Sequence, residues 1–216
     1  MENKNILTIE TSLGRIFLAV MRGSKYFSKT ISSPKSIEQD INLLLKDLIY
    51  ESKIEYNDID MIYVSLGPGS FTGIRIGIAV AKAIALCTKA KIFGFSNFES
   101  IFEQMFAIKP ELTKKKIQII IKGPGDEFFK KNFNCLKAEK QSYVIREKEL
   151  VFKSSAEKSI NVGNFKNTFK IKNYHYCIPD KFGFVKLIEK MKKNSGIEDL
   201  QEPTPIYVKE HYAKKK

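Results

Sequence analysis

The chain has 216 residues, of which 43% are hydrophobic, so it can bury one large hydrophobic core or two modest ones. Lysine and arginine outnumber the acidic residues 37 to 24, and most of the resulting net charge of +13 lies after residue 100. The three cysteines, at positions 87, 135 and 177, form no Cys-x-x-Cys pair, which argues against a zinc site or a disulfide framework and favours a reducing, cytoplasmic location.

The first predicted elements are three antiparallel strands. Residues 6–10 and 15–21 flank a Thr-Ser-Leu-Gly turn, and a Gly-Ser pair leads into a third strand at residues 26–31. Ser33-Pro34 predicts a helix start, after which apolar residues recur at helical spacing, at Ile37, Ile41, Leu44, Leu45 and Leu48. An apolar run at residues 61–65 predicts a strand buried on both faces.

A second helix is predicted from Ser70 or Thr72 to Leu86, after the turn Gly67-Pro68-Gly69. It is apolar nearly all round and carries a smooth stripe of small residues four positions apart: Gly73, Gly77, Ala81 and Ala85. Because a glycine inside a helix costs about 1 kcal/mol relative to alanine, we expect another helix to pack closely against this stripe. Burial of the helix inside its own domain is the alternative. The charge-free runs are too short for a membrane span.

A strand at residues 91–95 and a helix that begins at the capping box Ser96-Asn97-Phe98-Glu99 complete the first half. Three antiparallel strands followed by helix, strand, helix and strand predict an α/β fold with a mixed sheet and right-handed crossovers, the ribonuclease H-like order. Lys109-Pro110 marks the expected boundary between an N-terminal lobe, residues 1–108, and a smaller, diverged C-terminal lobe, residues 109–216.

The second half echoes the first and then diverges. Residues 116–121 and 127–133 predict a second hairpin. The later predicted elements are strands at residues 143–146, 159–163 and 174–178, a helix at 181–193 and an extended tail at 202–208 with a basic end. The lysine excess of this half is typical of a solvated surface, and it also permits attraction to polyanions.

The glycine-rich residues 67–73 raise the question of phosphate binding, because free amides at a helix N-terminus attract anions. Their spacing matches neither Gly-x-x-x-x-Gly-Lys-Ser/Thr nor Gly-x-Gly-x-x-Gly, and Pro68 breaks the Gly-x-Ser-x-Gly pattern of a serine hydrolase. Glu10 is the best single candidate for a catalytic acid or a ligand of a magnesium-bound water. The weak nucleotide-binding candidates are Glu10, Thr11, Ser12, Gly67 and Gly69.

Histidine is scarce in this chain. His175 and His211 are the only two, and they stand late in the sequence and far apart, so no His-x-x-x-His metal pair can form. A lone late histidine is more often a packed or surface residue than a catalyst. We therefore predict no metal site and no catalytic residue.

Four motifs resemble the TsaB (YeaZ) family, the bacterial partner proteins of the tRNA threonylcarbamoyladenosine pathway. They are Ile-Glu-Thr-Ser at residues 9–12, Leu-Gly-Pro-Gly-Ser-Phe-Thr-Gly-Ile-Arg-Ile-Gly at 66–77, Gly-Phe-Ser at 94–96 and Pro-Ile-Tyr-Val-Lys at 205–209. The second motif is long and specific, and the others follow in the right order. Residues 101–200 match poorly. Glu10 stands where the family usually has aspartate, and the usual Asp-Ala-Arg before the second hairpin is not visible.

The resemblance implies an actin-like (ASKHA) fold of two lobes and a non-catalytic subunit that pairs with a TsaD-like transferase through the helices of the first lobe. It also implies a TsaE-like ATPase as a further partner, tRNA bound through the complex, and ATP with magnesium only at the level of that complex. Together with the stripe, it gives a predicted partner interface: Ile37, Ile41, Leu44, Gly73, Ile74, Gly77, Ile78, Ala81 and Ala85. Three alternatives stay open: a homodimer through the same stripe, an actin-like ATP-binding kinase or ATPase acting alone, and a general RNA-binding module.

Overall fold

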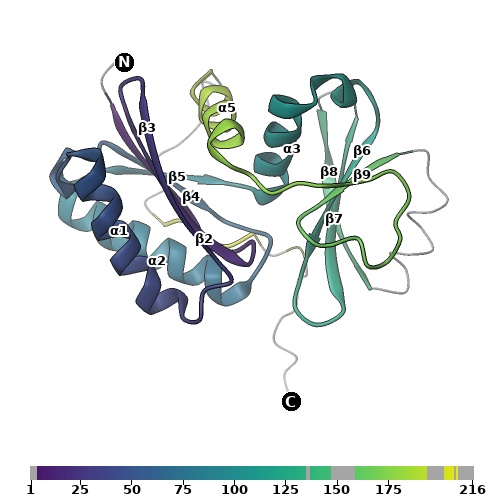
Figure 1. Ribbon diagram of the computed structural model, residues 1–216, viewed down its shortest axis with the longest axis horizontal. Helices are drawn as coiled ribbons and strands as arrows, with labels where there is room; N and C mark the ends of the chain where they lie inside the picture. The colour runs from purple at the N-terminus through teal and green to yellow at the C-terminus, as the bar shows by residue number, and fades with distance from the viewer. Residues whose placement is uncertain (1–3, 135–136, 147–158, 194–201, 207, 209–216) are drawn as a thin grey trace. The chain divides into compact units, whose positions relative to one another are not determined.

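The computed structural model describes residues 4–134, 137–146, 159–193, 202–206 and 208 (Figure 1). The chain divides into two compact units, the first built from residues 1–97 and 188–205 and the second from residues 98–187 and 206–216. The division falls at the start of helix α3 (Asn97–Ile108), whereas the sequence suggested a boundary between residues 108 and 109. The second unit therefore includes most of a helix that the prediction gave to the first lobe.

The first unit contains a five-stranded mixed sheet. Its strands are β1 (Asn5–Glu10), β2 (Arg15–Arg22), β3 (Lys25–Ser32), β4 (Met61–Ser65) and β5 (Lys91–Phe95). They lie in the order β3-β2-β1-β4-β5, with antiparallel pairing from β1 to β3 and parallel pairing from β1 through β4 to β5. This arrangement confirms the predicted ribonuclease H-like order.

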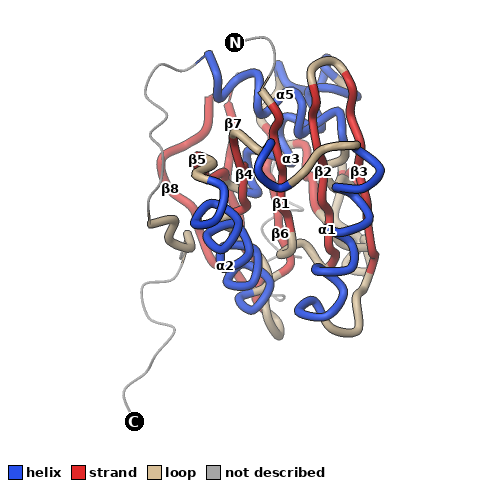
Figure 2. Tube along the Cα trace, turned by 90° about the vertical axis from the view of Figure 1, so that its left-hand side faces the viewer, coloured by secondary structure: helices blue, strands red, loops and turns tan. Residues whose placement is uncertain are grey.

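Helices α1 (Ile37–Ser52) and α2 (Phe71–Thr88) lie side by side on one face of this sheet (Figures 1 and 2). α1 packs on β2 and β3, and α2 packs on β4, β1 and β5. α1 begins after Ser36, later than the predicted start at Ser33-Pro34, because the Ser36 hydroxyl accepts a hydrogen bond from the amide of Gln39 and caps the helix there. A short 3-10 helix, η1 (Tyr56–Asp58), precedes β4.

The core of the first unit fills the space between the sheet and these two helices. The apolar positions of α1 face the sheet, because residues three and four apart share one side of a helix. Members of this core include Leu7, Ile9, Leu48, Ile62 and Ile78.

The second unit contains a sheet of the same design. Its strands are β6 (Ile117–Lys122), β7 (Glu127–Asn134), β8 (Lys137–Arg146), β9 (Ile160–Gly163) and β10 (Tyr174–Tyr176). β6 to β8 pair antiparallel, and β9 runs parallel to both β6 and β10, in the order β10-β9-β6-β7-β8. The predicted echo of the first half is therefore present in the strand pairing.

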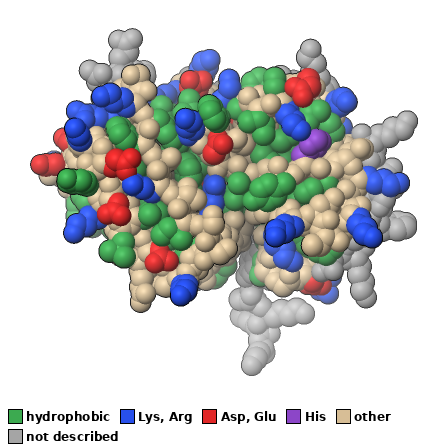
Figure 3. Space-filling view, in the orientation of Figure 1, with side chains coloured by type: hydrophobic (Ala, Val, Ile, Leu, Met, Phe, Trp, Pro, Cys, Tyr) green, Lys and Arg blue, Asp and Glu red, His purple; other side chains and the backbone are tan. Residues whose placement is uncertain are grey.

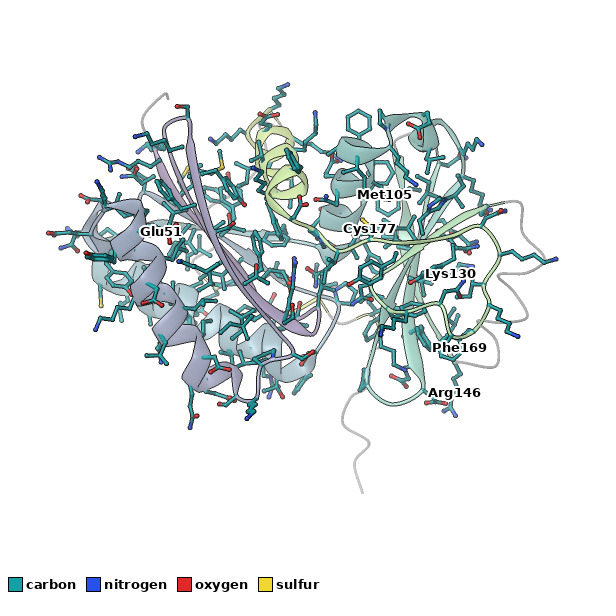
Figure 4. All side chains as sticks on the ribbon, viewed as in Figure 1. Glu51, Met105, Lys130, Arg146, Phe169 and Cys177 are labelled. Carbon is teal, nitrogen blue, oxygen red and sulfur yellow. The ribbon has the colours of Figure 1, made fainter. Side chains whose placement is uncertain are left out.

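One face of the second sheet packs against α3. Phe102 on the helix stacks on Phe133 of β7, with ring centroids 4.5 Å apart. Cys177 lies at this helix (Figure 4), where its Sγ is 3.9 Å from the carbonyl oxygen of Ile101. The 3-10 helix η2 (Pro110–Lys114) follows α3, and helix α5 (Lys181–Lys193) comes after β10.

The opposite face of the second sheet carries an aromatic cluster. Phe128 and Phe133 stand an odd number of residues apart on β7, and successive side chains of a strand point to opposite faces of its sheet. Phe128 and Phe133 therefore lie on opposite faces. The Phe128 ring lies 5.0 Å from that of Phe165, in the loop between β9 and β10. In this unit the segment from residue 164 to residue 173 is a loop, where the first unit has α2 between its two parallel strands.

Candidate functional site: the glycine-rich loop and the outer face of α2

The glycine stripe of α2 faces the sheet of its own unit. A Cβ atom at position 73 would overlap the backbone carbonyl of Thr11, and one at position 77 would lie 2.6 Å from the Thr11 hydroxyl oxygen. Thr11 Oγ1 in turn donates a 2.6 Å hydrogen bond to the carbonyl oxygen of Gly73. The small residues therefore let the first turns of α2 approach the turn that follows β1, and the element pressed against the stripe is this turn rather than another helix.

The predicted partner interface is consequently for the most part inside the first unit. Ile37 and Ala85 are half-buried, and the other predicted residues are buried against the sheet: Ile41, Leu44, Gly73, Ile74, Gly77, Ile78 and Ala81. The sequence predicted an interface on these two helices, and most of the predicted residues face their own sheet. A partner of this unit would meet the opposite side of each helix.

That opposite side of α2 is unusually apolar. We define the outer face of α2 by the exposed residues Arg75, Ala79, Lys82, Ala83, Leu86 and Cys87. Leu86 is 86% exposed, and Arg75 and Lys82 supply the charges of this face. By length and composition α2 could even cross a membrane, contrary to the expectation from its charge-free runs, but its other side is packed in a protein core.

The exposed side of α1 is mostly polar and charged, but it carries two large apolar side chains. Leu43 is 67% exposed and Tyr50 is 86% exposed, although both are large apolar residues. In the space-filling view, hydrophobic side chains lie at the surface of the first unit between charged ones (Figure 3). The exposed residues Leu43, Tyr50 and Leu86 were not among the predicted interface residues. For α2, the near absence of a polar side is the sequence signal that could have indicated its exposed apolar face.

The chain's own C-terminal segment reaches one position of this face. Lys82 Nζ lies 2.9 Å from Glu202 Oε2, and the neighbouring Pro203 is buried. At the start of the helix the Arg75 guanidinium lies 3.8 Å over the ring of Phe71, which shields part of that ring from water.

The structure brings the five nucleotide-binding candidates together, and it bonds Ser12 to Glu10. Glu10 is fully buried, and its Oε1 accepts hydrogen bonds from the amide of Ser12 (2.6 Å), the hydroxyl of Ser12 (3.0 Å) and the amide of Leu13 (3.0 Å). Its Oε2 lies 3.2 Å from Arg15 Nε, in an ion pair whose two side chains are both buried. This carboxylate therefore stabilises the turn after β1, and its oxygens accept hydrogen bonds from donors of the chain itself.

Asn97 joins the same turn to the glycine-rich loop. Its Nδ2 donates to Ser12 Oγ (2.7 Å) and to the carbonyl of Pro68 (2.9 Å), while Ser65 Oγ donates to its Oδ1 (2.8 Å). Sequence reasoning placed Asn97 only in a capping box and missed this role. The sequence alone cannot show that a residue bridges two loops, because the loops are far apart in the chain and meet only in the folded structure.

Backbone amides of the glycine-rich loop also donate hydrogen bonds within this unit. The amide of Ser70 donates to the carbonyl of Ser12 (2.8 Å), and the amide of Gly67 donates to Ser65 Oγ (3.2 Å). A Cβ at position 69 would overlap that same Ser12 carbonyl, so glycine is required for this close approach. Within the part of the chain that is described, no group of three His, Cys, Asp or Glu side chains is placed to hold a metal ion.

The sequence has relatives of two kinds. Residues 32–121 match the family model of TsaD, tRNA N6-adenosine threonylcarbamoyltransferase. The chain is 33% identical to the tRNA threonylcarbamoyladenosine biosynthesis protein TsaB of Buchnera aphidicola from Schizaphis graminum, over 54% of this chain and 53% of that protein. It is 31% identical to the Escherichia coli protein of the same name over 43% of this chain and 40% of that protein. The matches thus span about half the length of these curated relatives.

Solved structures extend the likeness over nearly the whole fold. YeaZ from Pseudomonas aeruginosa superposes with a TM-score of 0.74 at 15% identity, covering 94% of this chain and 99% of that one. Another solved structure, of a Pseudomonas aeruginosa protein with similarity to peptidase YEAZ, superposes with a TM-score of 0.76 at 16% identity, covering 95% of this chain and all of that one. The solved structures thus show that the chain has the fold of YeaZ over nearly its whole length, and about half of its sequence is similar to TsaB proteins.

Proposed function

We propose that this relative of the TsaB proteins is a non-catalytic subunit in tRNA threonylcarbamoyladenosine biosynthesis and that it binds a TsaD-like transferase through the exposed sides of α1 and α2. The observation that carries the proposal is the outer face of α2, where Leu86 is 86% exposed on a helix otherwise suited to a protein interior. Exposed apolar faces of this kind, with charges at their edges, are typical of protein interfaces.

The composition of this face suits a second protein better than a small ligand. Ala79 and Ala83 leave room for another helix to approach closely, while Leu86 on the same face and Leu43 on α1 supply side chains that can fill its grooves. Arg75 adds positive charge at the face, and the ion pair of Lys82 with Glu202 adds polar groups, which can fix the register of the partner.

The non-catalytic part of the proposal is supported by the cluster around Glu10. A general acid or a magnesium ligand must offer an oxygen to the substrate or the ion, whereas the oxygens of Glu10 accept hydrogen bonds from Ser12 and Leu13 and pair with Arg15. We place the chemistry on the TsaD-like subunit, with ATP and magnesium, a TsaE-like ATPase and the tRNA engaged at the level of the complex in the cytoplasm.

Co-purification with the TsaD-like protein of the same organism tests this proposal. Leu86→Glu should abolish capture of that protein, because it replaces an apolar side chain of the contact with a carboxylate that would be taken out of water. Ile108→Glu, the same kind of change at a half-exposed apolar residue of the second unit, is the matched control and should capture it normally. Undiminished capture by a folded Leu86→Glu protein would refute the proposed surface.

The second candidate function is an actin-like ATPase or kinase that acts alone. The observation in its favour is that Glu10, Ser12 and Gly67 meet at the ends of parallel strands β1 and β4, where enzymes of α/β folds commonly bind ligands. Calorimetry of the isolated chain decides between the two. Magnesium-dependent ATP binding in the micromolar range would favour the enzyme, and its absence would favour the subunit.

A further inference from the structure

The outer face of α2 carries two cations with different surroundings. Lys82 Nζ lies 2.9 Å from Glu202 Oε2, so a carboxylate of the chain itself already matches its charge. The Arg75 guanidinium instead contacts the ring of Phe71, 3.8 Å from the ring centroid. α2 has no acidic residue, and Arg75 pairs with no carboxylate among the residues that the structure describes. The two cations of this face therefore differ in whether their charge is matched.

The Phe71 ring holds the Arg75 guanidinium in place. The two residues stand four apart at the start of α2, so they lie on the same side of the helix. A guanidinium against an aromatic ring is attracted by the negative face of that ring. Its five N–H donors lie in the plane of the group and point outward from its edge. Arg75 can therefore donate hydrogen bonds to another molecule while it keeps its contact with Phe71.

A protein that covers the outer face of α2 changes the surroundings of Arg75. Arg75, Ala79 and Leu86 are exposed on the same side of the helix, so a partner that covers the two apolar residues also takes the guanidinium out of water. A charge buried without an acceptor weakens binding, because its hydration is lost and nothing replaces it. A carboxylate accepts two parallel N–H bonds from a guanidinium and so replaces the lost contacts with water.

We propose that Arg75 determines how the partner docks, by forming an ion pair with one Asp or Glu side chain of the TsaD-like protein. The inference rests on the proposed function, because it specifies the chemistry of the partner at that same surface. The carboxylate of the partner lies opposite the first turns of α2, and none is required opposite Lys82. A protein without an acidic residue at that place would leave Arg75 buried and unpaired, so the pair contributes specificity.

A protein carboxylate suits this position better than a phosphate of a nucleic acid. Nucleic acids bind where several cations contact successive phosphates, because affinity grows with the number of phosphates that are neutralised. On the outer face of α2, Arg75 is followed by Ala79 and Ala83, and the second cation, Lys82, is paired with Glu202. One cation at the end of a row of apolar side chains matches one fixed carboxylate at a protein interface.

Titration calorimetry of the full chain with the TsaD-like protein of the same organism tests the ion pair. Arg75→Gln should weaken binding about ten- to one-hundred-fold, the effect of losing hydrogen bonds between charged groups. Arg75→Lys should recover only part of this loss, because an ammonium group cannot form two parallel bonds to a carboxylate. Phe71→Leu should weaken binding about three-fold, because the guanidinium loses the ring that positions it.

Two further substitutions separate this effect from a general loss of positive charge. Arg146→Gln makes the same change at an exposed position of β8, in the second unit, and should leave the affinity unchanged. Lys82→Gln removes the other cation of the outer face and should weaken binding less than about three-fold, because its charge is already matched at the surface. Since the side chains of Arg75, Lys82 and Arg146 are exposed, these variants should unfold at the temperature of the parent chain.

The carboxylate of the partner can be identified in the same assay. Exposed Asp and Glu residues of the TsaD-like protein are replaced one at a time with Asn and Gln, and each variant is titrated with the parent chain and with Arg75→Gln. At one position, the two substitutions together should weaken binding no more than either does alone, as expected for residues in direct contact. Arg75→Glu should regain affinity when the partner carries arginine at that position.

Four results would overturn the inference. Parental affinity of Arg75→Gln, with binding lost in Leu86→Glu, would remove the ion pair and leave the proposed function intact. Equal losses for Arg75→Gln and Lys82→Gln would reduce the effect to general positive charge. Unchanged affinity of Arg75→Gln for the TsaD-like protein, with weaker binding of tRNA, would assign Arg75 to a phosphate. Failure of the parent chain to bind the TsaD-like protein would refute the proposed function and this inference with it.

Discussion

Thr11 and Gly73 are joined by a 2.6 Å hydrogen bond from the threonine hydroxyl to the glycine carbonyl oxygen, which ties the first turns of α2 to the turn after β1. The bond requires the helix backbone to come within contact distance of the Thr11 carbonyl, and any side chain at position 73 would prevent this. The glycine that weakens the helix thus permits the junction on which the first unit is built.

Gly73→Ala should therefore destabilise the chain, although alanine normally favours a helix. The added methyl group meets backbone rather than a movable side chain, so we expect a loss of about 2 kcal/mol after the gain in helix propensity. Gly77→Ala should cost less, because its methyl group meets the Thr11 side chain, which can rotate. Urea unfolding measures both values, and an equal or smaller loss for Gly73→Ala would contradict this account.

Glu10→Gln should also destabilise the first unit. The amide can still accept from the Ser12 backbone but removes the negative charge that faces the buried Arg15 guanidinium, and breaking a buried ion pair costs about 3 kcal/mol. The matched control is Glu51→Gln, since Glu51 pairs with Lys29 at the surface, on the exposed end of α1 (Figure 4). Its free energy of unfolding should change by less than about 1 kcal/mol. Similar losses for the two variants would show that burial of the Glu10 pair has no effect.

The isolated chain should self-associate through the outer face of α2, because that apolar face is uncovered when no other protein binds it. Ala79→Glu places a charge at the centre of the face and should yield a monomer in analytical ultracentrifugation. Self-association should also decline when the TsaD-like protein is added, since both would occupy the same residues. Dimers that persist in Ala79→Glu would locate the self-contact elsewhere.

His175 should titrate at a lower pH than an ordinary histidine. Burial and the nearby Lys109 ammonium both disfavour the imidazolium, so the pKa of His175 lies below 6.5. Because the unfolded chain binds this proton more readily, the contribution of His175 to stability is complete above pH 6.5 and is lost as the pH falls towards the pKa of the folded state. Lys109→Met should raise that pKa, and Lys186→Met should leave it unchanged. Proton NMR of the imidazole, assigned with His211→Asn, measures the shift.

The sequence predicted most of the strands and their connections, because these depend on local pattern. The hairpin of β6 and β7 and the later β9 and β10 follow from apolar runs between turn residues, and their bounds agree with the predicted ranges within a few residues. The start of α1 was placed too early because Ser33-Pro34 has the composition of a helix start, while Ser33 in fact adopts a left-handed backbone conformation with φ of 54°.

The site was harder to predict, for a physical reason. A row of small residues at Gly73, Gly77 and Ala81 shows that something lies close, but periodicity carries no information on whether a sheet or a helix lies there. Leu86, the most exposed large hydrophobic residue of α2, looks in the sequence like any other apolar residue of a buried helix. Glu10 likewise has the position of a functional carboxylate, and only the three-dimensional contacts show that its oxygens are occupied.

The two sheets share one plan, yet α2 has no counterpart between β9 and β10, where residues 164–173 form a loop. A subunit with equivalent docking helices in both halves could join neighbours at two ends and grow into a filament. Here the loop offers no second helix of that kind. If the chain docks through α2 as proposed, we expect one neighbour on this surface for each copy of the chain and therefore a complex of fixed stoichiometry.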